Sequence, residues 1–559
     1  MNYHADINQI NVINAPIDSR LIVTAGPGSG KTFTAAQRLI RLVGEDSDGL
    51  NFLAVSFSRA AAQAIEDALT LAGLRGRVEI RTIDGWASRI NREFADPDDI
   101  DQATTYDDRI KLAIRTIEEN ESAIQEVVDY LIVDEAQDIF DARSELIQQI
   151  CTSSWITGWV VLGDLAQKIY DFVNESEVVG ESLLESMSSK AEELEVEKHE
   201  LITDFRCSNS ELFRIRELGS EIRSSTAMRD HYSLWDEFTA LHLLGSIDQL
   251  VGVLDAFASD DLSSAVLTRQ NRLALEISYQ LSEAGVPHRV IGGSNEYFVP
   301  DWVADLQECK SKSELLQSCP AYINRDLLAV EVTKLCAKGS SDSYDFRYLA
   351  EAIRSRKVPQ VLLQGDRRGV TISSIHQSKG LEFDRVVLQT EKPLATNEDL
   401  LSETRVLFVG LTRAKADVLR FQMDKRIESR RSMDRSIDFI WRNTPRPVRI
   451  EIKPGDIQFL RQVQRGVRLE ARLISVQNDQ IPIYGLFEPD SKECLANISE
   501  SFSKAVKMNW RTDLPGVFTG LYEIGEQTIA RPLSYGDGDS RPHLVTVPVL
   551  RGMLEVEEK

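Results

Sequence analysis

A glycine-rich turn that follows a short apolar run constrains this chain more than any other feature. Residues 25–32 read AGPGSGKT, and residues 21–24 (LIVT) before them have the character of a buried strand. The glycines allow successive N–H groups to turn inward around an anion, and the helix from Phe33 points its positive end at the same place. A tight turn without a ligand is the alternative, but Gly-Lys-Thr after an apolar strand is typical of a phosphate-binding loop. We expect ATP to bind through Ala25, Gly26, Pro27, Gly28, Ser29, Gly30, Lys31 and Thr32.

Further apolar segments alternate with helical segments after this loop, which indicates an α/β fold with a doubly wound parallel sheet. One of them, residues 130–133, ends in Asp134 and Glu135. Because ligands bind at the carboxyl ends of such strands, these acids should face the glycine loop. We expect Lys31 to reach the β- and γ-phosphates and Glu135 to orient and deprotonate the attacking water. Thr32 and Asp134 are expected to hold Mg²⁺. The other strands predicted here are residues 51–58, 78–82 and 159–162.

The chain of 559 residues is too long for one compact core, so several domains are expected. Residues 1–200 are predicted to form the first RecA-like ATPase domain, with a small insert at about 91–129. Its last part, residues 174–200, is acidic and is expected to be helical.

A second alternating set predicts another α/β domain over residues 201–445, with a helical insert at about 294–368. From 446 to 559 the apolar–polar alternation and the Gly, Pro and Asn turns predict a small β-rich domain of unknown role. The apolar segments assigned to the second α/β domain are residues 265–268, 289–293, 369–375, 386–389 and 406–413.

Composition limits the compartment and the partners. Six scattered cysteines with no C-x-x-C spacing favour a reducing cytosol and oppose a zinc or iron–sulfur site. No apolar run approaches the length that a bilayer requires, so no membrane contact is expected. The net charge of −24 opposes nonspecific binding of a polyanion by the whole surface. Any nucleic acid must therefore bind through a local basic channel, with base stacking to help.

Polar groups also follow the strand at residues 159–162. Gln167 is placed to sense the γ-phosphate, and Tyr170 and Phe172 offer flat surfaces to bases, although core packing explains Phe172 equally well. Arg206 and Arg413 lie at the edge of the predicted second domain. An arginine brought across a domain interface neutralises charge on the transferring phosphoryl group. Taken singly, each arginine is better explained as a surface ion-pair residue.

Considered together and in order, these motifs resemble those of the UvrD/Rep family of superfamily 1 DNA helicases. The resemblance covers most of residues 6–420, and eight motifs in the family's order leave chance agreement negligible. In this sequence they read AGPGSGKT, FLAVSFSRAAA, RTIDGWASR, IVDEAQD, VVLGDLAQKIY, ITDFRCS, ISSIHQSKGLEF and ETRVLFVGLTRA.

The resemblance implies a role for each matching residue at the nucleotide site. Lys31, Thr32, Asp134 and Glu135 would form the hydrolytic centre, and Arg206 and Arg413 would be arginine fingers from the second domain. The other members of the implied nucleotide site are Gln9, which would read adenine, Arg38 and Phe205, which would sandwich its ring, Glu382, which would contact the nucleotide, and Gln167, which would couple nucleotide state to DNA.

The resemblance also implies a single-stranded DNA channel and movement from the 3′ toward the 5′ end. ATP would draw the two domains together, hydrolysis would release them, and alternating grips would make each cycle one step. The residues implied for the channel are Phe57, Thr82, Arg89, Tyr170, Phe172 and His376.

The chain departs from the family pattern in ways that favour translocation or DNA-stimulated hydrolysis over processive unwinding. Asp84 stands where the family has His, and an acid beside a phosphate backbone should weaken the contact. Residues 165–166 are Leu-Ala in place of an acidic pair, and residues 172–173 are Phe-Val in place of Trp-Arg. Both predicted inserts are short. Such accessory-poor helicases resemble those paired with nucleases in prokaryotic anti-phage systems such as Gabija.

Three functions remain open at this point. The first is an ATP-driven single-stranded DNA translocase or helicase. The second is a DNA-sensing regulatory ATPase that controls a partner nuclease, bound through the C-terminal domain. A generic transporter or recombination ATPase is disfavoured, because no LSGGQ-like signature occurs and the last two motifs would be unexplained. Residues 425–472 are rich in arginine, which indicates either a nucleic-acid or partner surface or a solvated linker.

Overall fold

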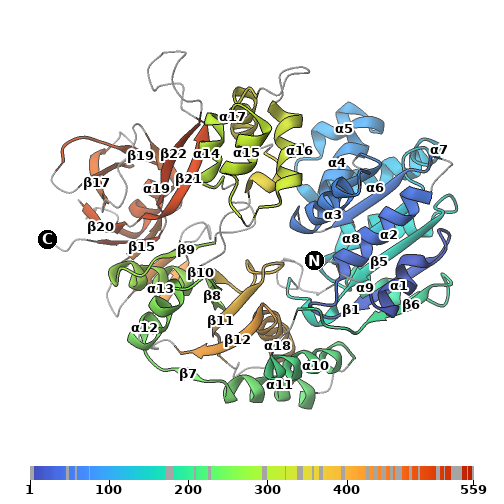
Figure 1. Cartoon of the computed structure of the whole chain (residues 1–559), viewed down its shortest axis with the longest axis horizontal. Coiled ribbons are helices and arrows are strands. Elements are labelled where there is room, and N and C mark those ends of the chain that lie inside the picture. The colour runs from blue at the N-terminus through green and yellow to red at the C-terminus, as the bar shows by residue number, and fades with distance from the viewer. Residues whose placement is uncertain are drawn as a thin grey trace. The chain divides into compact units, whose positions relative to one another are not determined.

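The chain forms two compact units in a computed structural model. Unit 1 comprises Met1–Ala240, Gly380–Glu382 and Lys392–Asp417, and unit 2 comprises Leu241–Lys379, Phe383–Glu391 and Val418–Lys559. Figure 1 labels their elements. The structure describes residues 5–45, 49–56, 59–74, 76–170, 180–206, 209–224, 228–291, 299–321, 323–336, 344–355, 358–363, 369–391, 397–422, 428–431, 438–441, 449–452, 457–459, 469–476, 481–488, 491–510, 517–521, 523–530, 544–550 and 552–556.

Unit 1 is built on a parallel sheet in the order β3-β2-β4-β5-β1-β6. Alternate residues of its strands point to opposite faces, so Leu21 and Val23 belong to one core cluster and Ile22 to the other. Near-continuous apolar runs of this kind are what a strand buried on both faces requires. The strands are β1 (Arg20–Ala25), β2 (Phe52–Ser56), β3 (Val78–Thr82), β4 (Tyr130–Asp134), β5 (Gly158–Gly163) and β6 (Glu197–Leu201).

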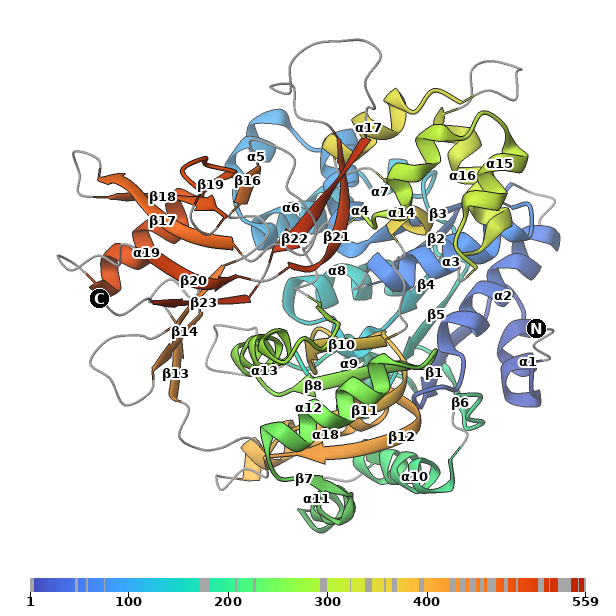
Figure 2. The same ribbon diagram turned by 60° about the vertical axis from the view of Figure 1, so that its left-hand side comes forward.

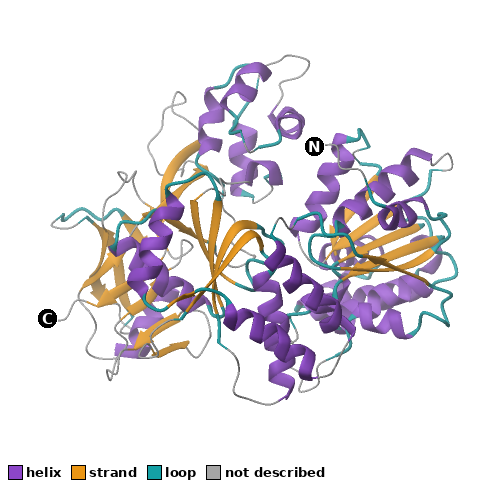
Figure 3. Ribbon diagram, turned by 60° about the horizontal axis from the view of Figure 1, so that its bottom comes forward, coloured by secondary structure: helices purple, strands orange, loops and turns teal. Residues whose placement is uncertain are grey.

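Helices cover both faces of this sheet (Figure 3). The cluster on one face takes side chains from α1 (Ile7–Asn14), α2 (Lys31–Glu45) and α3 (Arg59–Leu71). The cluster on the other face takes them mainly from α4, α6, α8 and α9. Within the range predicted as the first insert, α6 is part of this core and packs on α4 and α8. The bounds are α4 (Ile83–Phe94), α5 (Pro97–Gln102), α6 (Tyr106–Glu119), α7 (Glu121–Ile124), α8 (Asp141–Thr152) and α9 (Leu183–Ser189).

Two stretches of unit 1 differ from the predicted secondary structure. Residues 197–200, expected at the end of an acidic helix, belong to the edge strand β6, which pairs with β1 and exposes its charged side chains. Residues 406–411, included among the apolar segments of the second domain, lie in α18 (Asn397–Leu411). A short apolar run does not distinguish a buried strand from a buried helix.

Three helices complete unit 1. Both α10 (Ser210–Ser224) and α18 pack against the short helix η2 (Leu165–Gln167), and α11 (Met228–Ala240) packs on α10 and α18. A hydrogen bond of 3.0 Å from Trp235 Nε1 to Thr404 Oγ1 links α11 to α18. The ring of Phe408 lies so close to Gly219 that a Cβ there would meet it at 2.3 Å, which explains the glycine in the middle of α10.

Unit 2 contains a second sheet, in the order β7-β12-β11-β8-β10-β9. The pairs of β8 with β10 and with β11 are parallel, and so is the pair of β9 with β10. Helices α12 (Ile247–Ala258) and α13 (Asn271–Glu283) share an apolar cluster with this sheet. Its strands are β7 (Leu243–Leu244), β8 (Ser263–Thr268), β9 (His288–Val290), β10 (Gly369–Ser374), β11 (Phe383–Gln389) and β12 (Ala414–Phe421), the last of which begins in unit 1.

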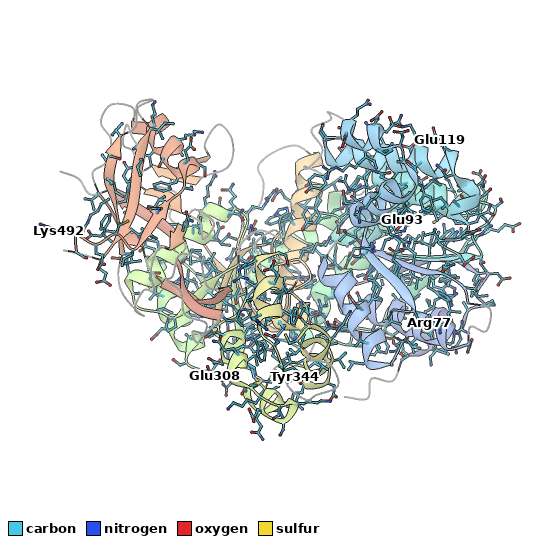
Figure 4. The ribbon with its side chains drawn as sticks, turned by 90° about the horizontal axis from the view of Figure 1, so that it is seen from above. Arg77, Glu93, Glu119, Glu308, Tyr344 and Lys492 are labelled. Atoms are coloured by element: carbon cyan, nitrogen blue, oxygen red, sulfur yellow. The ribbon has the colours of Figure 1, made fainter. Side chains whose placement is uncertain are left out.

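The insert of unit 2 is a small helical body with its own core. Figure 4 labels Glu308 and Tyr344 on it. A hairpin of β21 (Glu523–Ala530) and β22 (Leu544–Leu550) packs against it: Leu544 is buried in the insert's cluster, and the Gln307 amide bonds both the N–H and the carbonyl oxygen of Leu544 at 3.1 Å. The helices of the insert are α14 (Trp302–Asp305), η4 (Leu306–Glu308), α15 (Lys312–Ser318), α16 (Arg325–Cys336), α17 (Arg347–Arg354) and η5 (Gln360–Leu363).

The rest of the C-terminal region is an antiparallel sheet in the order β13-β14-β15-β23-β20-β17-β18-β19-β16. Helix α19 (Glu500–Trp510) packs on this sheet (Figure 2). The contact includes Phe502, whose ring meets those of Tyr484 and Phe518 edge-on. The strands are β13 (Glu428–Arg431), β14 (Asp438–Trp441), β15 (Arg449–Ile452), β16 (Ile457–Phe459), β17 (Leu469–Val476), β18 (Pro482–Phe487), β19 (Ala496–Ile498), β20 (Val517–Leu521) and β23 (Gly552–Val556).

The predicted fold class is confirmed: parallel sheets flanked by helices are followed by a β-rich C-terminal region. Residues 201–240 belong to the same unit as residues 1–200. The C-terminal region belongs to the same unit as the second parallel sheet. Among the residues that the structure describes, no helix is long and apolar enough to cross a bilayer. The five cysteines within the described ranges are free thiols.

Candidate nucleotide site

The glycine loop connects β1 to α2 and has the conformation that only glycine adopts easily. Gly28 and Gly30 have φ values of +77° and +79°. Space is also tight, because a Cβ on Gly28 would lie 2.4 Å from Asp204 Oδ1, and one on Gly30 would lie 2.6 Å from Gln9 Nε2. Both glycines are therefore required by backbone angle and by close approach. Inside the loop, Lys31 Nζ donates to the Ala25 carbonyl at 3.2 Å, and Ser29 Oγ donates to the Gly26 carbonyl at 2.7 Å.

The two predicted metal-binding residues lie side by side. Thr32 Oγ1 donates to Asp134 Oδ2 at 2.8 Å, from the start of α2 to the end of β4. Burial, with the charge of the neighbouring Glu135, raises the pKa of Asp134 to about 6, and the charge of Lys31 opposes this shift. A buried carboxylate that is costly to ionise, next to a hydroxyl oxygen, suits a hard divalent cation. The residues present therefore fit a metal ion held by Thr32, Asp134 and nucleotide phosphates.

Glu135 stands at the end of β4 with a φ of +57°, an uncommon backbone conformation for a residue other than glycine. Its N–H donates to Asp134 Oδ1 at 2.9 Å, and its carboxylate accepts from Gln137 Nε2. The Asp134 carboxylate thus holds the backbone of Glu135, and the Gln137 amide fixes the direction of the Glu135 carboxylate. Such a preset direction suits a group that must receive a proton from a positioned water.

From Gln137 a series of buried polar contacts extends to Arg413. Gln137 Oε1 accepts from the Asp164 N–H at 2.9 Å, and Gln167 Nε2 donates to Asp164 Oδ2 at 2.7 Å. Arg413 Nη2 then donates to Gln167 Oε1 at 3.2 Å. Every donor and acceptor in this series is buried, so each contact is worth more than it would be in water. We call Glu135, Gln137, Asp164, Gln167 and Arg413 the relay.

Both predicted arginine fingers lie in unit 1, together with the loop. Arg206 directly follows Phe205, whose N–H donates to the Gly28 carbonyl at 3.0 Å, and Arg206 forms an ion pair with Glu382. Burial lowers the pKa of Arg206, and burial together with the charge of Arg206 lowers that of Arg413 to about 9. Cations that are costly to keep buried and close together are stabilised by an anionic ligand.

Two side chains predicted to contact adenine have other partners in this structure. Gln9 belongs to the capping box of α1, and its Nε2 donates to the Ser29 carbonyl at 3.0 Å, so its amide lies against the loop. Arg38 is fully buried beneath α1 and donates to Tyr130 Oη at 2.6 Å and to backbone carbonyls, including those of Val12 and Ala15 at 2.7 and 2.8 Å. These contacts anchor α1, and the contact of Arg38 with adenine stays a prediction.

The remaining nucleotide-site predictions lie at the surface. Phe205, the second stacking residue, is 40% exposed beside the loop. Glu382 pairs with Lys415 at 3.5 Å as well as with Arg206. The contacts of Phe205 and Glu382 with a nucleotide stay predictions.

The residues predicted for single-stranded DNA are not all described. Phe57 and Phe172 lie outside the described residues. In unit 1, Thr82 caps α4 by accepting from the Gly85 N–H, and Arg89 forms ion pairs with Glu79 and Glu93. Tyr170 is half-buried, and burial, together with the charges of Asp138 and Glu135, raises its pKa to about 12. His376 follows β10 in unit 2.

Sequence reasoning missed Gln137, Asp164 and the arginines of α10. Gln137 and Asp164 lay inside motifs that were identified, at strand ends where polar side chains gather, so their signal was available. Arg216 pairs with Asp204 and donates to the Ala414 carbonyl at 2.9 Å, whereas Arg223 lies near Asp164. No local motif marks these two arginines. Their spacing of seven residues, which puts them on one helix face, is the only indication.

Comparison with known proteins agrees with this geometry. Residues 9–173 match the AAA domain family, and residues 369–419 match the UvrD-like helicase C-terminal domain. These matches, together with the loop and the ordered motifs, support a UvrD-like helicase, and domains of this kind suggest an ATP-hydrolysing enzyme that binds a nucleotide with a metal ion. The chain is also similar to the Gabija protein GajB of Bacillus cereus (strain VD045), at 23% identity over 477 residues, which cover 71% of this chain and 91% of GajB.

Proposed function

We propose that this chain is an ATP hydrolase that is stimulated by single-stranded DNA and moves along it, from the 3′ toward the 5′ end. The observation that carries this proposal is the relay, which joins Glu135, after β4, to Arg413 through one part-buried contact and three buried ones. A change at Arg413 or Gln167 therefore acts on the carboxylate expected to receive the proton. Coupling of this kind is what an ATPase regulated by a second ligand requires.

The proposed division of labour follows from the positions of the side chains. The loop N–H groups and Lys31 hold the β- and γ-phosphates. Thr32 and Asp134 would hold Mg²⁺, which would offset the charge of the phosphate oxygens. Glu135 orients the attacking water and accepts its proton. Arg206 and Arg413 neutralise charge that develops on the transferring phosphoryl group. DNA stimulates the reaction through Gln167, which contacts both Asp164 and Arg413.

The decisive experiment measures ATP hydrolysis by the full chain with single-stranded, duplex, 3′-tailed and 5′-tailed DNA. We expect strong stimulation by single strands, and displacement of the shorter strand to depend on a 3′ tail. Lys31→Ala should abolish hydrolysis, and Glu135→Gln should slow it by about 10²–10⁴-fold without loss of nucleotide binding. Lys111→Ala, at an exposed position of α6 in the same unit, is the matched control. Wild-type protein that no polynucleotide stimulates would refute the proposal.

A second candidate is a DNA-sensing ATPase that controls a partner nuclease in a Gabija-like defence system. The similarity to GajB supports it, and so does the acidic surrounding of α4, where Glu79, Asp84 and Glu93 pair with the basic side chains. Strong DNA-stimulated hydrolysis without strand displacement on any tailed substrate would favour this candidate. Binding of a nuclease through residues 450–559 would also favour it, and efficient displacement by the chain alone would count against it.

A further inference from the structure

Helix α10 brings one more cation to the glycine loop than the helicase motifs supply. Arg223 lies in the last turn of α10, in the same unit as the loop. A Cβ built on Gly26 would lie 3.4 Å from Arg223 Nη2 and 3.8 Å from Nη1, so the guanidinium lies beside the first glycine of the loop. Arg223 Nε lies 3.5 Å from Asp164 Oδ1.

The guanidinium of Arg223 is only partly satisfied. Its side chain is 13% exposed, and within the described part of the chain neither Nε nor Nη1, both buried, has a hydrogen-bond partner. A buried guanidinium is stable only where acceptors meet its N–H groups. The 3.5 Å separation from Asp164 is too long for a good hydrogen bond, so these donors can still be used.

The place where Arg223 lies is the place where phosphate is expected. The ammonium of Lys31, which pairs with β- and γ-phosphates, contacts the Ala25 carbonyl, one residue before Gly26. Both cations are therefore at the beginning of the loop. At the beginning of the loop, the negative charge of a bound nucleotide comes from its outer phosphates and not from its base. A planar guanidinium with unused donors matches phosphate oxygens.

Asp164 connects this arginine to the rest of the site. It is fully buried, it accepts from Gln167 Nε2 at 2.7 Å and from the Ala166 N–H at 3.1 Å, and its own N–H donates to Gln137. A ligand that draws Arg223 away from Asp164 changes the charge felt by a central member of the relay. Burial makes this effect strong, because little water screens it.

We propose that Arg223 is a triphosphate-sensing residue: it contacts the γ-phosphate of the bound nucleotide, and its withdrawal from Asp164 transmits the presence of that phosphate to Gln167 and Arg413. This inference rests on the proposed function, in that the site is taken to bind ATP. It assigns to α10 the discrimination between ATP and ADP.

The test compares binding of Mg²⁺-ADP with that of a Mg²⁺-bound nonhydrolysable ATP analogue, by the full chain in the absence of DNA. Arg223→Ala should weaken binding of the analogue by about tenfold and change ADP binding by less than about twofold, because one charge-assisted hydrogen bond to the outer phosphate is lost. Arg223→Lys should restore part of the difference, and Arg223→Gln should not. The control is Arg214→Ala on the same helix, where the arginine is 71% exposed and pairs with Glu237.

A purely structural role for Arg223 would weaken both nucleotides equally, and this outcome would overturn the inference, as would unchanged binding of both. The two proposals fail separately. Wild-type protein that distinguishes the nucleotides through Arg223 but is not stimulated by DNA refutes the proposed function and leaves the sensing role intact. Wild-type protein that binds neither nucleotide refutes both.

Discussion

Arg38 has the position of a structural anchor in this chain. Helix α1 ends at Asn14, and the last carbonyls of a helix have no partner within it. The Arg38 guanidinium donates to the carbonyls of Val12, Ala15 and Pro16, at 2.7 to 2.8 Å. It thereby satisfies the end of α1 and holds Gln9, on the same helix, against the loop.

Replacing Arg38 should therefore affect stability rather than base recognition. Arg38→Ala leaves several buried carbonyls without a donor, and we expect the free energy of unfolding to fall by about 2–4 kcal/mol. Chemical denaturation followed by tryptophan fluorescence measures this, since Trp86 and Trp159 are buried in the same unit. The preference for ATP over GTP in the folded fraction should stay the same. A lost preference with unchanged stability would restore the stacking role.

Individual residues of the site were predictable wherever the chemistry depends on local sequence. The loop glycines and Lys31 lie in one short motif, and Asp134 and Glu135 come at the end of an apolar strand. The local sequence therefore predicts where these side chains lie. Arg38 and Arg223 were not predictable, because their roles depend on which distant segments pack beside them. The acceptors of Arg38 lie in α1, and the neighbour of Arg223 follows β5.

At the scale of elements, five of the six strands of the first sheet were predicted to within two residues at each end, mainly because strands buried on both faces read as continuous apolar runs. The edge strand β6 was missed for the opposite reason. It is buried only at Leu201, and its exposed glutamates resemble those of an acidic helix. Strand pairing with β1, which is a tertiary contact, decides its conformation.

Helix α4 offers a prediction about DNA. Asp84 lies in its first turn, where an acid is favourable, and forms a bidentate ion pair with Arg143, which also pairs with Asp107. Asp84→Asn removes a charge that repels a phosphate backbone and leaves Arg143 less neutralised. We expect single-stranded DNA to bind about two- to fivefold more tightly at low salt. The slope of log K against the logarithm of the salt concentration should become steeper by about the amount that one added phosphate contact gives.

Fluorescence anisotropy of a labelled oligonucleotide at several salt concentrations measures the effect of Asp84→Asn. The control is Glu119→Gln at the end of α6, which removes the same charge from unit 1 (Figure 4). An equal gain in the control would show that only net charge matters. No gain in Asp84→Asn would place the DNA path away from α4.

At the scale of the whole molecule, the nucleotide should stabilise unit 1. The loop, α10 and α18 of this unit meet at one site. A ligand that binds only the folded state raises the free energy of unfolding by about 2.7 kcal/mol when its concentration is one hundred times its Kd. Thermal unfolding of the full chain should therefore shift upward by a few degrees with Mg²⁺-ADP. Differential scanning fluorimetry measures this shift, and Lys31→Ala should abolish it. A shift that persists in Lys31→Ala would locate nucleotide binding elsewhere.

The hairpin of β21 and β22 also affects the order in which unit 2 becomes complete. Leu544 is buried among side chains of residues 299–362, and it bonds Gln307, 237 residues earlier in the chain. Strand β23 pairs with β15, which also lies far back in the chain, so both contacts form only when the C-terminal residues are present. During synthesis the ribosome makes the helical insert long before the residue that fills its core. Until Leu544 is made, the insert therefore exposes the apolar side chains that this residue covers. A chain that ends before β22 would leave these side chains exposed permanently.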